Sequence, residues 1–244
     1  MDTIKLTLEY DGTAYAGWQR QPDQPTVQSV LEKVLAQITQ TSLSTMAAGR
    51  TDAGVHALGQ VVSFRSEKAM TVSEWRRALN GLLPRDIAVQ AIEVAPENFH
   101  PRYNAIGKIY EYQILNSPYR SALNHHRVWH IPKPLDVAAM DLASNFFLGK
   151  HDFSSFQCSP TDNENPLCLI ERCAVTHKSP LLVITIQADR FLKQMVRTMV
   201  GTLVEVGQGH RMPSDIKGIL QRADRRSAGK TAPPHGLYLV KVLF

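Results

Sequence analysis

The chain has 244 residues and a mass of 27.3 kDa, with 43% hydrophobic and 20% charged residues, so a folded core is possible and wholesale disorder is excluded. Its 14 glycines and 14 prolines match average usage, which excludes collagen-like and proline-rich classes. The net charge of +5 is compatible with a nucleic-acid partner without requiring one. Residues 123–244 hold 15 of the 27 basic residues and 10 of the 22 acidic ones, so the excess lies in the second half.

The cysteines and the chain's first residues bear on the compartment. Cys158, Cys168 and Cys173 are an odd number with no C-x-x-C spacing, which argues against a disulfide framework or a zinc knuckle. In residues 1–10, apolar and polar residues alternate from Ile4 onward. This stretch lacks the basic region and the apolar region of a secretory leader. No apolar run reaches the roughly eighteen residues that a membrane span needs. We therefore expect a cytoplasmic protein with no membrane and no metal.

The first half alternates strand-like and helix-like patterns. Apolar residues at every second position from Ile4 to Tyr10 predict a strand, and apolar spacings of three and four after Thr26 predict a helix with Thr26 as its N-cap. Thr71 and Glu74 have the spacing of a capping box. The other predicted segments are a polar turn at 49–57, a strand at 61–65, a helix from 71 to about 81, and a strand at 87–94.

The second half repeats this order after a connection at 96–101. The predicted elements are strands at 107–115, 127–131, 168–178, 181–188 and 237–244, a helix from Asp136 to Gly149, a long helix from about 190 to 206, and a shorter one after 214. Such a pattern predicts an α+β protein of two halves, 1–105 and 106–244. We expect a mixed, mainly antiparallel sheet flanked by helices.

One polar segment stands out between two predicted strands. In residues 49–57, two glycines flank Arg50 and Asp52, which would lie on one side of the backbone if the strand extends that far. An Asp-x-Gly sequence is also a common turn, and without further context that interpretation is favoured.

Four further segments carry polar, aromatic or basic groups that could have a function. Residues 10–21 combine three aromatics with several hydrogen-bonding groups on a glycine-punctuated loop. Tyr110 and Tyr112 share one strand face. They could pack within the sheet or form a surface on which a nucleic-acid base stacks. In the long helix, Arg190, Lys193 and Arg197 fall within an arc of roughly 60° at the margin of an apolar stripe. Residues 207–230 hold six basic and two acidic residues. They could form a solvated surface or a surface that contacts phosphates.

Together these segments resemble the bacterial tRNA pseudouridine synthases of the TruA family almost from end to end. The ordered motifs are Tyr10-Asp11-Gly12 with Gly17-Trp18-Gln19-x-Gln21, Thr26-Val27-Gln28, the 49–57 segment with Gly59-Gln60-Val61, Phe99-His100-x-Arg102, Lys108-x-Tyr110-x-Tyr112, Gly149-x-His151-Asp152-Phe153, Met195-Val196-Arg197 with Gly201, and Ala232-Pro233-Pro234-x-Gly236-Leu237. Pro101 departs from the alanine that is frequent in the family, at a position with no catalytic role.

The resemblance implies a role for each of five residues. Asp52 aligns with the aspartate that reacts covalently, Arg197 with its arginine partner, and Tyr110 with a tyrosine that stacks on the target base. Arg50 aligns with a basic residue that helps to hold the RNA flipped open, and Leu237 would line the uracil pocket. It also implies ferredoxin-like-related halves with an active-site cleft between them. It further implies a homodimer without cofactors that isomerises uridines at positions thirty-eight to forty of the tRNA anticodon stem-loop.

Two other function classes remain as alternatives from the sequence. A non-catalytic tRNA-binding or chaperone protein would explain the basic second half, but it gives no reason for Asp52, Tyr110 and Arg197 to occur together. A two-metal nuclease needs several clustered carboxylates, and the 49–57 segment offers only Asp52.

Overall fold

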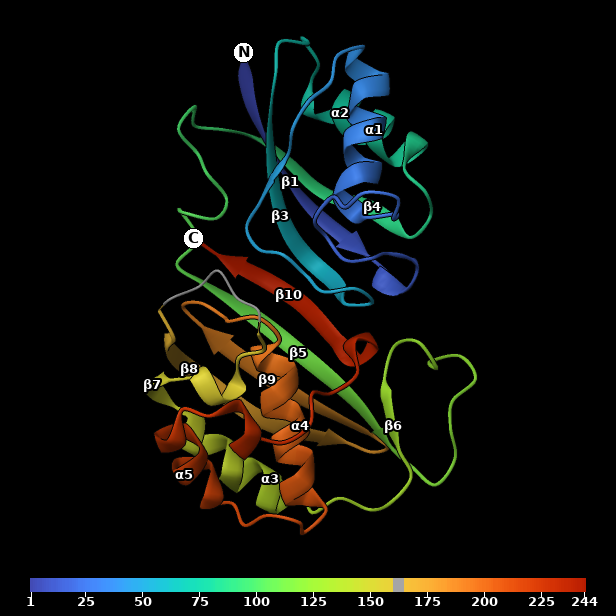
Figure 1. The fold of residues 1–244 in the computed structure, drawn as a ribbon. Helices are drawn as coiled ribbons and strands as arrows, with labels where there is room; N and C mark the ends of the chain where they lie inside the picture. Colours follow the sequence, from blue (N-terminus) through green and yellow to red (C-terminus); the bar gives the residue numbers. More distant parts are fainter. Residues whose placement is uncertain (160–164) are drawn as a thin grey trace. The chain divides into compact units, whose positions relative to one another are not determined.

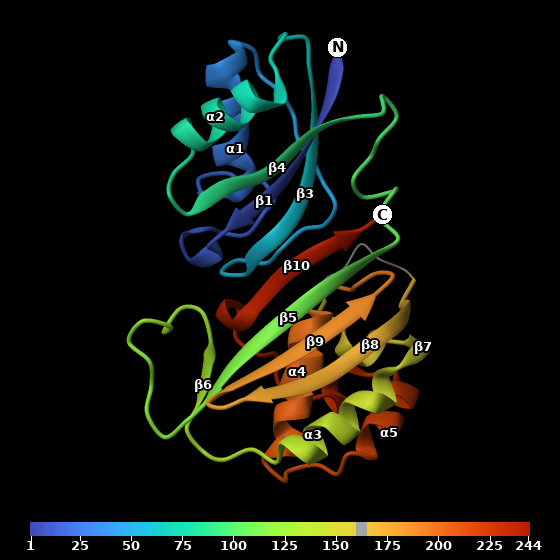
Figure 2. The ribbon, with the colours of Figure 1, turned by 180° about the vertical axis from the view of Figure 1, so that it is seen from behind.

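The computed structural model describes residues 1–159 and 165–244. They form two compact units, one made of Met1–Ile106 with Tyr238–Phe244 and the other of Gly107–Leu237. Each unit is a sheet flanked by helices (Figures 1 and 2), which confirms the α+β class. No helix within the described ranges combines the length and apolar character needed to cross a membrane.

The first unit is built on a sheet whose strand order is β4-β1-β3-β10. Strands β1 (Asp2–Tyr10), β3 (His56–Ser66) and β4 (Ile87–Ala95) pair antiparallel, β10 (Leu237–Leu243) pairs parallel with β3, and the short β2 (Met46–Ala47) also pairs with β3. Helices α1 (Val27–Thr39) and α2 (Val72–Leu82) cover one face of this sheet (Figures 1 and 2).

The apolar alternation and the helix caps predicted from the sequence are present in this unit. Ile4, Leu6, Leu8 and Tyr10 are at most 2% exposed, so the alternation of β1 buries one face. Thr26 caps α1 and Thr71 caps α2, each with a complete capping box in which the third helical residue bonds back to the cap.

The second unit has the strand order β5-β9-β8-β7, all antiparallel. These are β5 (Gly107–Asn116), β7 (Gly149–Asp152), β8 (Leu167–Lys178) and β9 (Leu181–Ala188), and β6 (Trp129–Ile131) pairs parallel with the end of β5. Helices α3 (Val137–Ser144), α4 (Met195–Gly207) and α5 (Asp215–Arg222) lie on one face (Figures 1 and 2). Short 3-10 turns occur at Gly12–Ala14, Asn145–Phe147, Ser154–Phe156, Arg225–Ser227 and Pro234–Gly236.

Two predicted helices are shorter than expected. Helix α3 ends at Ser144 rather than Gly149, since a 3-10 turn follows and Gly149 opens β7 with a φ of +96°. The long helix begins at Met195 rather than near 190, because Gln194 has a left-handed φ of +58°. Arg190 and Lys193 therefore lie outside the helix, and the predicted basic arc with Arg197 is wrong.

The last strand is placed differently from the sequence-based division. Residues 238–244 were expected in the second half, but they group with the first unit because Tyr238 and Leu239 pair with His56 and Ala57 of β3. The ring of Tyr238 also stacks on His56, with 4.8 Å between ring centroids.

Candidate active site

Asp52 lies in the loop that joins β2 to β3. The strand does not reach back to Arg50, since β3 starts at His56, so the expected shared strand face of Arg50 and Asp52 is not formed. The loop closes as a turn in which the Val55 N–H donates to the Asp52 carbonyl oxygen at 3.1 Å, with Gly54 at a φ of +76°. Asp52 is partly exposed and Arg50 is exposed.

The loop is fixed against residues 12–18, which lie within the first sequence motif. The Trp18 N–H donates to the Thr51 carbonyl oxygen at 3.0 Å, and the Gly54 N–H donates to the Tyr15 carbonyl oxygen at 3.3 Å. A Cβ atom on Gly12 would lie 2.0 Å from the Val55 carbonyl oxygen, so this backbone contact requires glycine. The polar, aromatic loop therefore has a structural task, which is to hold the backbone on both sides of Asp52.

Two buried side chains reinforce this contact. The Tyr10 hydroxyl lies 2.8 Å from the Thr51 hydroxyl, and burial raises the pKa of Tyr10 to about 12. His56 Nδ1 accepts a hydrogen bond from the Gly12 N–H at 3.0 Å and lies 3.2 Å from Asp11 Oδ1. The residues before and after Asp52 are thus bonded into the core of the first unit.

In the second unit, Tyr110 and Tyr112 share one face of β5 but differ in role. Tyr112 is fully buried and donates its hydroxyl to the Pro233 carbonyl oxygen at 2.7 Å. Burial raises the pKa of Tyr112, and the charge of Arg197 opposes that rise. Tyr110 is 7% exposed and meets Phe191 edge to face, with 4.9 Å between ring centroids. Sheet packing therefore explains Tyr112, while Tyr110 remains the candidate for stacking on a base.

Arg197 is oriented by the segment that precedes β10. Its Nε donates to the Ala232 carbonyl oxygen at 2.8 Å, and the Ala232 N–H donates to the Arg197 carbonyl oxygen at 3.0 Å. One turn later, a Cβ atom on Gly201 would lie 1.7 Å from the Lys230 carbonyl oxygen. The motif around Arg197 therefore packs against residues 230–232, which explains the glycine at position 201.

The predicted site residues fall in the two units. Asp52 and Arg50 belong to the first unit, and Tyr110, Arg197 and the 6%-exposed Leu237 belong to the second. Within the described residues, no group of three or more His, Cys, Asp or Glu side chains is placed to hold a metal ion.

Sequence reasoning missed three residues that support this site. Thr51 and Ala232 act through a hydroxyl and a carbonyl group, and no local pattern indicates such long-range bonds. Phe191 falls within the helix predicted from about 190 to 206, whereas in the structure it precedes the helix and contacts Tyr110. Because no glycine or asparagine marks the left-handed residue Gln194, the sequence carried no signal of this break.

Comparison with known proteins settles the family. A model of the tRNA pseudouridine synthase family matches residues 7–104 and 143–244. The chain belongs to this family. Tyr110 lies between the two segments that the family model matches.

Full-length members of the pseudouridine synthase family are similar over the whole chain. A tRNA pseudouridine synthase A of Caldicellulosiruptor saccharolyticus is 41% identical over all of both chains, and one of Geotalea daltonii is 43% identical over all of both chains. One of Myxococcus xanthus is 45% identical over the whole of this chain and 92% of its own. These matches include β5 and Tyr110.

Proposed function

We propose that the protein isomerises uridine to pseudouridine in the anticodon stem and loop of tRNA, at positions thirty-eight to forty, with Asp52 as its nucleophile. Membership in the tRNA pseudouridine synthase family is the observation that carries the activity. The full-length similarity to proteins named tRNA pseudouridine synthase A supports tRNA as the substrate.

The chemistry suits the residues. The reaction breaks the N1–C1′ bond and forms a C5–C1′ bond; C5 loses a proton and N1 gains one, so there is no net oxidation or hydrolysis. A carboxylate is an adequate nucleophile toward C1′ of the sugar or C6 of the uracil. The clamped loop around Asp52 supports its role, since a nucleophile must be held in a fixed orientation.

The second unit supplies the partners in this proposal. In this proposal Arg197 is the cationic partner of the nucleophile, and its bond to Ala232 fixes the guanidinium. Tyr110 stacks on the flipped uracil, Leu237 lines its pocket and Arg50 holds the RNA open. Flipping costs a few kcal/mol, which contacts to the extruded nucleotide offset.

We also propose that the protein acts in the cytoplasm as a homodimer without a cofactor. Light scattering of the purified protein at several concentrations measures the assembly directly. A mass of about twice 27.3 kDa is expected, and a monomer at all concentrations would contradict this part of the proposal.

Mapping of pseudouridine tests the substrate assignment. tRNA from a strain that lacks the gene is compared with tRNA from the same strain with the gene restored, by carbodiimide treatment and primer extension. Stops at positions thirty-eight to forty should appear only when the gene is present. Stops elsewhere would overturn the proposed positions, and no gene-dependent stops would overturn the activity.

A further inference from the structure

Glu32 is a buried carboxylate that the proposed reaction does not use. It lies on α1 and is only 9% exposed, although a buried charge is costly unless it is paired and hydrogen-bonded. Its Oε1 accepts hydrogen bonds from the Thr45 N–H at 2.9 Å, the Thr45 hydroxyl at 3.0 Å and the Gln28 amide at 3.1 Å. Three neutral donors therefore already satisfy this oxygen.

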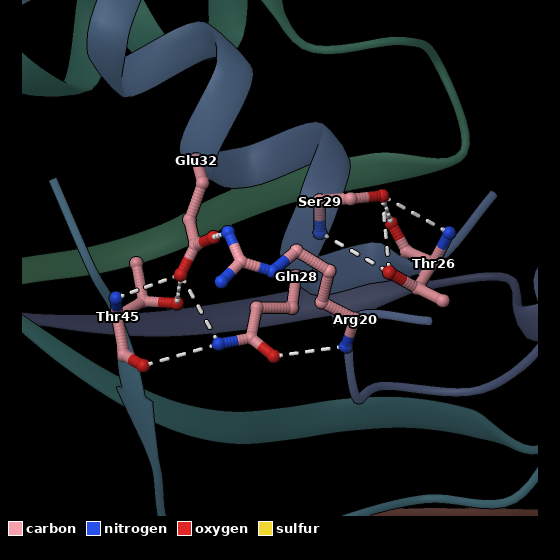
Figure 3. A network of polar contacts seen from close by, with 6 residues as sticks. All are labelled: Arg20, Thr26, Gln28, Ser29, Glu32 and Thr45. Atoms are coloured by element: carbon pink, nitrogen blue, oxygen red, sulfur yellow. Dashed lines mark hydrogen bonds and ion pairs between the residues drawn. The ribbon is translucent and has the colours of Figure 1, made fainter. Parts of the chain in front are cut away.

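The second oxygen of Glu32 serves a different partner. Oε2 lies 3.3 Å from Nη1 of Arg20, and Figure 3 shows the guanidinium next to the carboxylate. The Arg20 side chain is nevertheless 67% exposed. Among the described residues this is the only hydrogen bond that the guanidinium makes, and a guanidinium has five N–H donors. Most of its hydrogen-bonding capacity is therefore directed at solvent.

The backbone of Arg20 is fixed as well. Its N–H donates to the side-chain oxygen of Gln28 at 3.0 Å, and the Gln28 N–H donates to the Trp18 carbonyl oxygen at 3.1 Å. Figure 3 shows Gln28 joining Arg20, Glu32 and Thr45 in one network. An exposed arginine on a loop usually costs side-chain entropy when it binds, and this network removes part of that cost in advance.

Arg20 is also close in the chain to the loop of the proposed nucleophile. The Trp18 N–H is bonded to the carbonyl oxygen of Thr51, the residue before Asp52. Two extended residues span at most about 7 Å, so the backbone of Arg20 lies near that contact. A nucleotide that reacts at Asp52 would bring its flanking phosphates into this region, and a guanidinium binds phosphate bidentately.

We propose that Arg20 binds a backbone phosphate of the RNA substrate, and that Glu32 is the positioning residue that holds its guanidinium. This inference rests on the proposed action on tRNA. It explains why a hydrogen-bonded network holds an exposed cation beside the Asp52 loop. Stability alone does not explain this arrangement, because an exposed ion pair contributes little to stability.

Binding of unmodified tRNA transcript to an Asp52→Ala protein, at salt concentrations between about 50 and 200 mM, tests the phosphate contact. Arg20→Gln in this background should weaken binding roughly tenfold. It should also reduce the slope of log K against log salt by roughly 0.7–0.9, the value for one phosphate. Arg20→Lys should keep the slope and show a smaller loss of affinity. An unchanged slope in Arg20→Gln would overturn the phosphate contact.

Arg76→Gln is the matched control, because it removes the same charge from an exposed arginine of α2 in the same unit. Its slope should stay near that of the parent protein. An equal drop in slope would show that only net charge matters and would overturn the proposal.

Glu32→Gln tests the positioning role, because glutamine retains Oε1 and its three donors but replaces Oε2 with a donor. Binding should weaken severalfold at an unchanged salt slope. In the Arg20→Gln background the same substitution should have no further effect, as expected for two residues that act together. An equal effect in both backgrounds would show that Glu32 acts only through the fold. If Glu32→Gln does not fold, Thr45→Val, which removes one of the three donors to Oε1, should weaken binding and have no further effect in the Arg20→Gln background, whereas equal effects in both backgrounds would contradict the positioning role.

The two proposals fail in different ways. Turnover of the same transcript by the wild-type protein is measured separately. Absence of pseudouridine would contradict the proposed function, whereas normal turnover with an unchanged slope in Arg20→Gln would contradict only the role of Arg20.

Discussion

Gly17 lies so close to Thr51 that a Cβ atom on it would be 2.6 Å from the Thr51 carbonyl oxygen, and its φ of +94° disfavours any other residue. Gly17→Ala should therefore displace the backbone next to Asp52. We expect a loss of kcat/KM of tenfold or more and a lower Tm, since positional errors near 1 Å can cost about a hundredfold in rate. Steady-state kinetics and thermal unfolding measure both effects.

Gly81→Ala is the control for that substitution. Gly81 lies in α2, and a Cβ atom there would have no neighbour within 4 Å. Alanine is favoured over glycine in a helix by about 1 kcal/mol, so this variant should be slightly more stable and fully active. A comparable loss of activity in Gly81→Ala would contradict the role assigned to Gly17.

Tyr10 should make the free energy of unfolding decrease as the pH rises into the alkaline range. Burial raises its pKa in the folded state to about 12, above the value near 10 of an unfolded chain. The stabilisation is complete below pH 10 and is lost as the pH rises toward 12, by roughly 2–3 kcal/mol. Urea unfolding at pH 8, 10 and 11.5 measures it.

Tyr10→Phe isolates this contribution. At pH 8 the variant should be about 1 kcal/mol less stable, because it loses the hydrogen bond to Thr51. The difference should shrink above pH 10 and then reverse, as only the wild type must release a buried proton. Tyr119→Phe, which removes a hydroxyl at a residue that is 83% exposed, is the control. A constant difference between wild type and Tyr10→Phe would contradict the assignment.

Phe191 should matter for activity through Tyr110. Phe191→Leu removes an edge-to-face contact worth about 0.5–1.5 kcal/mol, so the ring that we propose to stack on uracil loses its fixed orientation. We expect kcat/KM to fall roughly three- to tenfold. Phe191→Tyr should restore most of it. Phe146→Leu is the control, because the ring of Phe146 contacts Lys217 instead; equal losses in the two variants would contradict the role of Phe191.

Local signals predicted most of the helices and strands. Thr26 and Thr71 cap their helices and the alternation of β1 buries one face, because these features depend on neighbouring residues alone. The sequence could not reveal the break at Gln194 or the pairing of Tyr238 with His56, which depend on packing between distant segments. It likewise could not reveal the burial of Glu32, whose partners come from three separate stretches of the chain.

The site was predicted unevenly for the same reason. Asp52, Tyr110 and Arg197 emerged from motifs, and the structure adds the contacts that hold them, through Thr51, Phe191 and Ala232. The glycines of the motifs gain a physical explanation only when the opposing backbone is known.

Tritium release is the most direct test of the central claim that Asp52 is the nucleophile of a tRNA uridine isomerase. A tRNA transcript labelled with tritium at uracil C5 loses the label when C5 bonds to C1′. The wild-type protein should release it. Asp52→Asn and Asp52→Ala should release none while they still bind the transcript. An active Asp52→Ala protein would contradict the account.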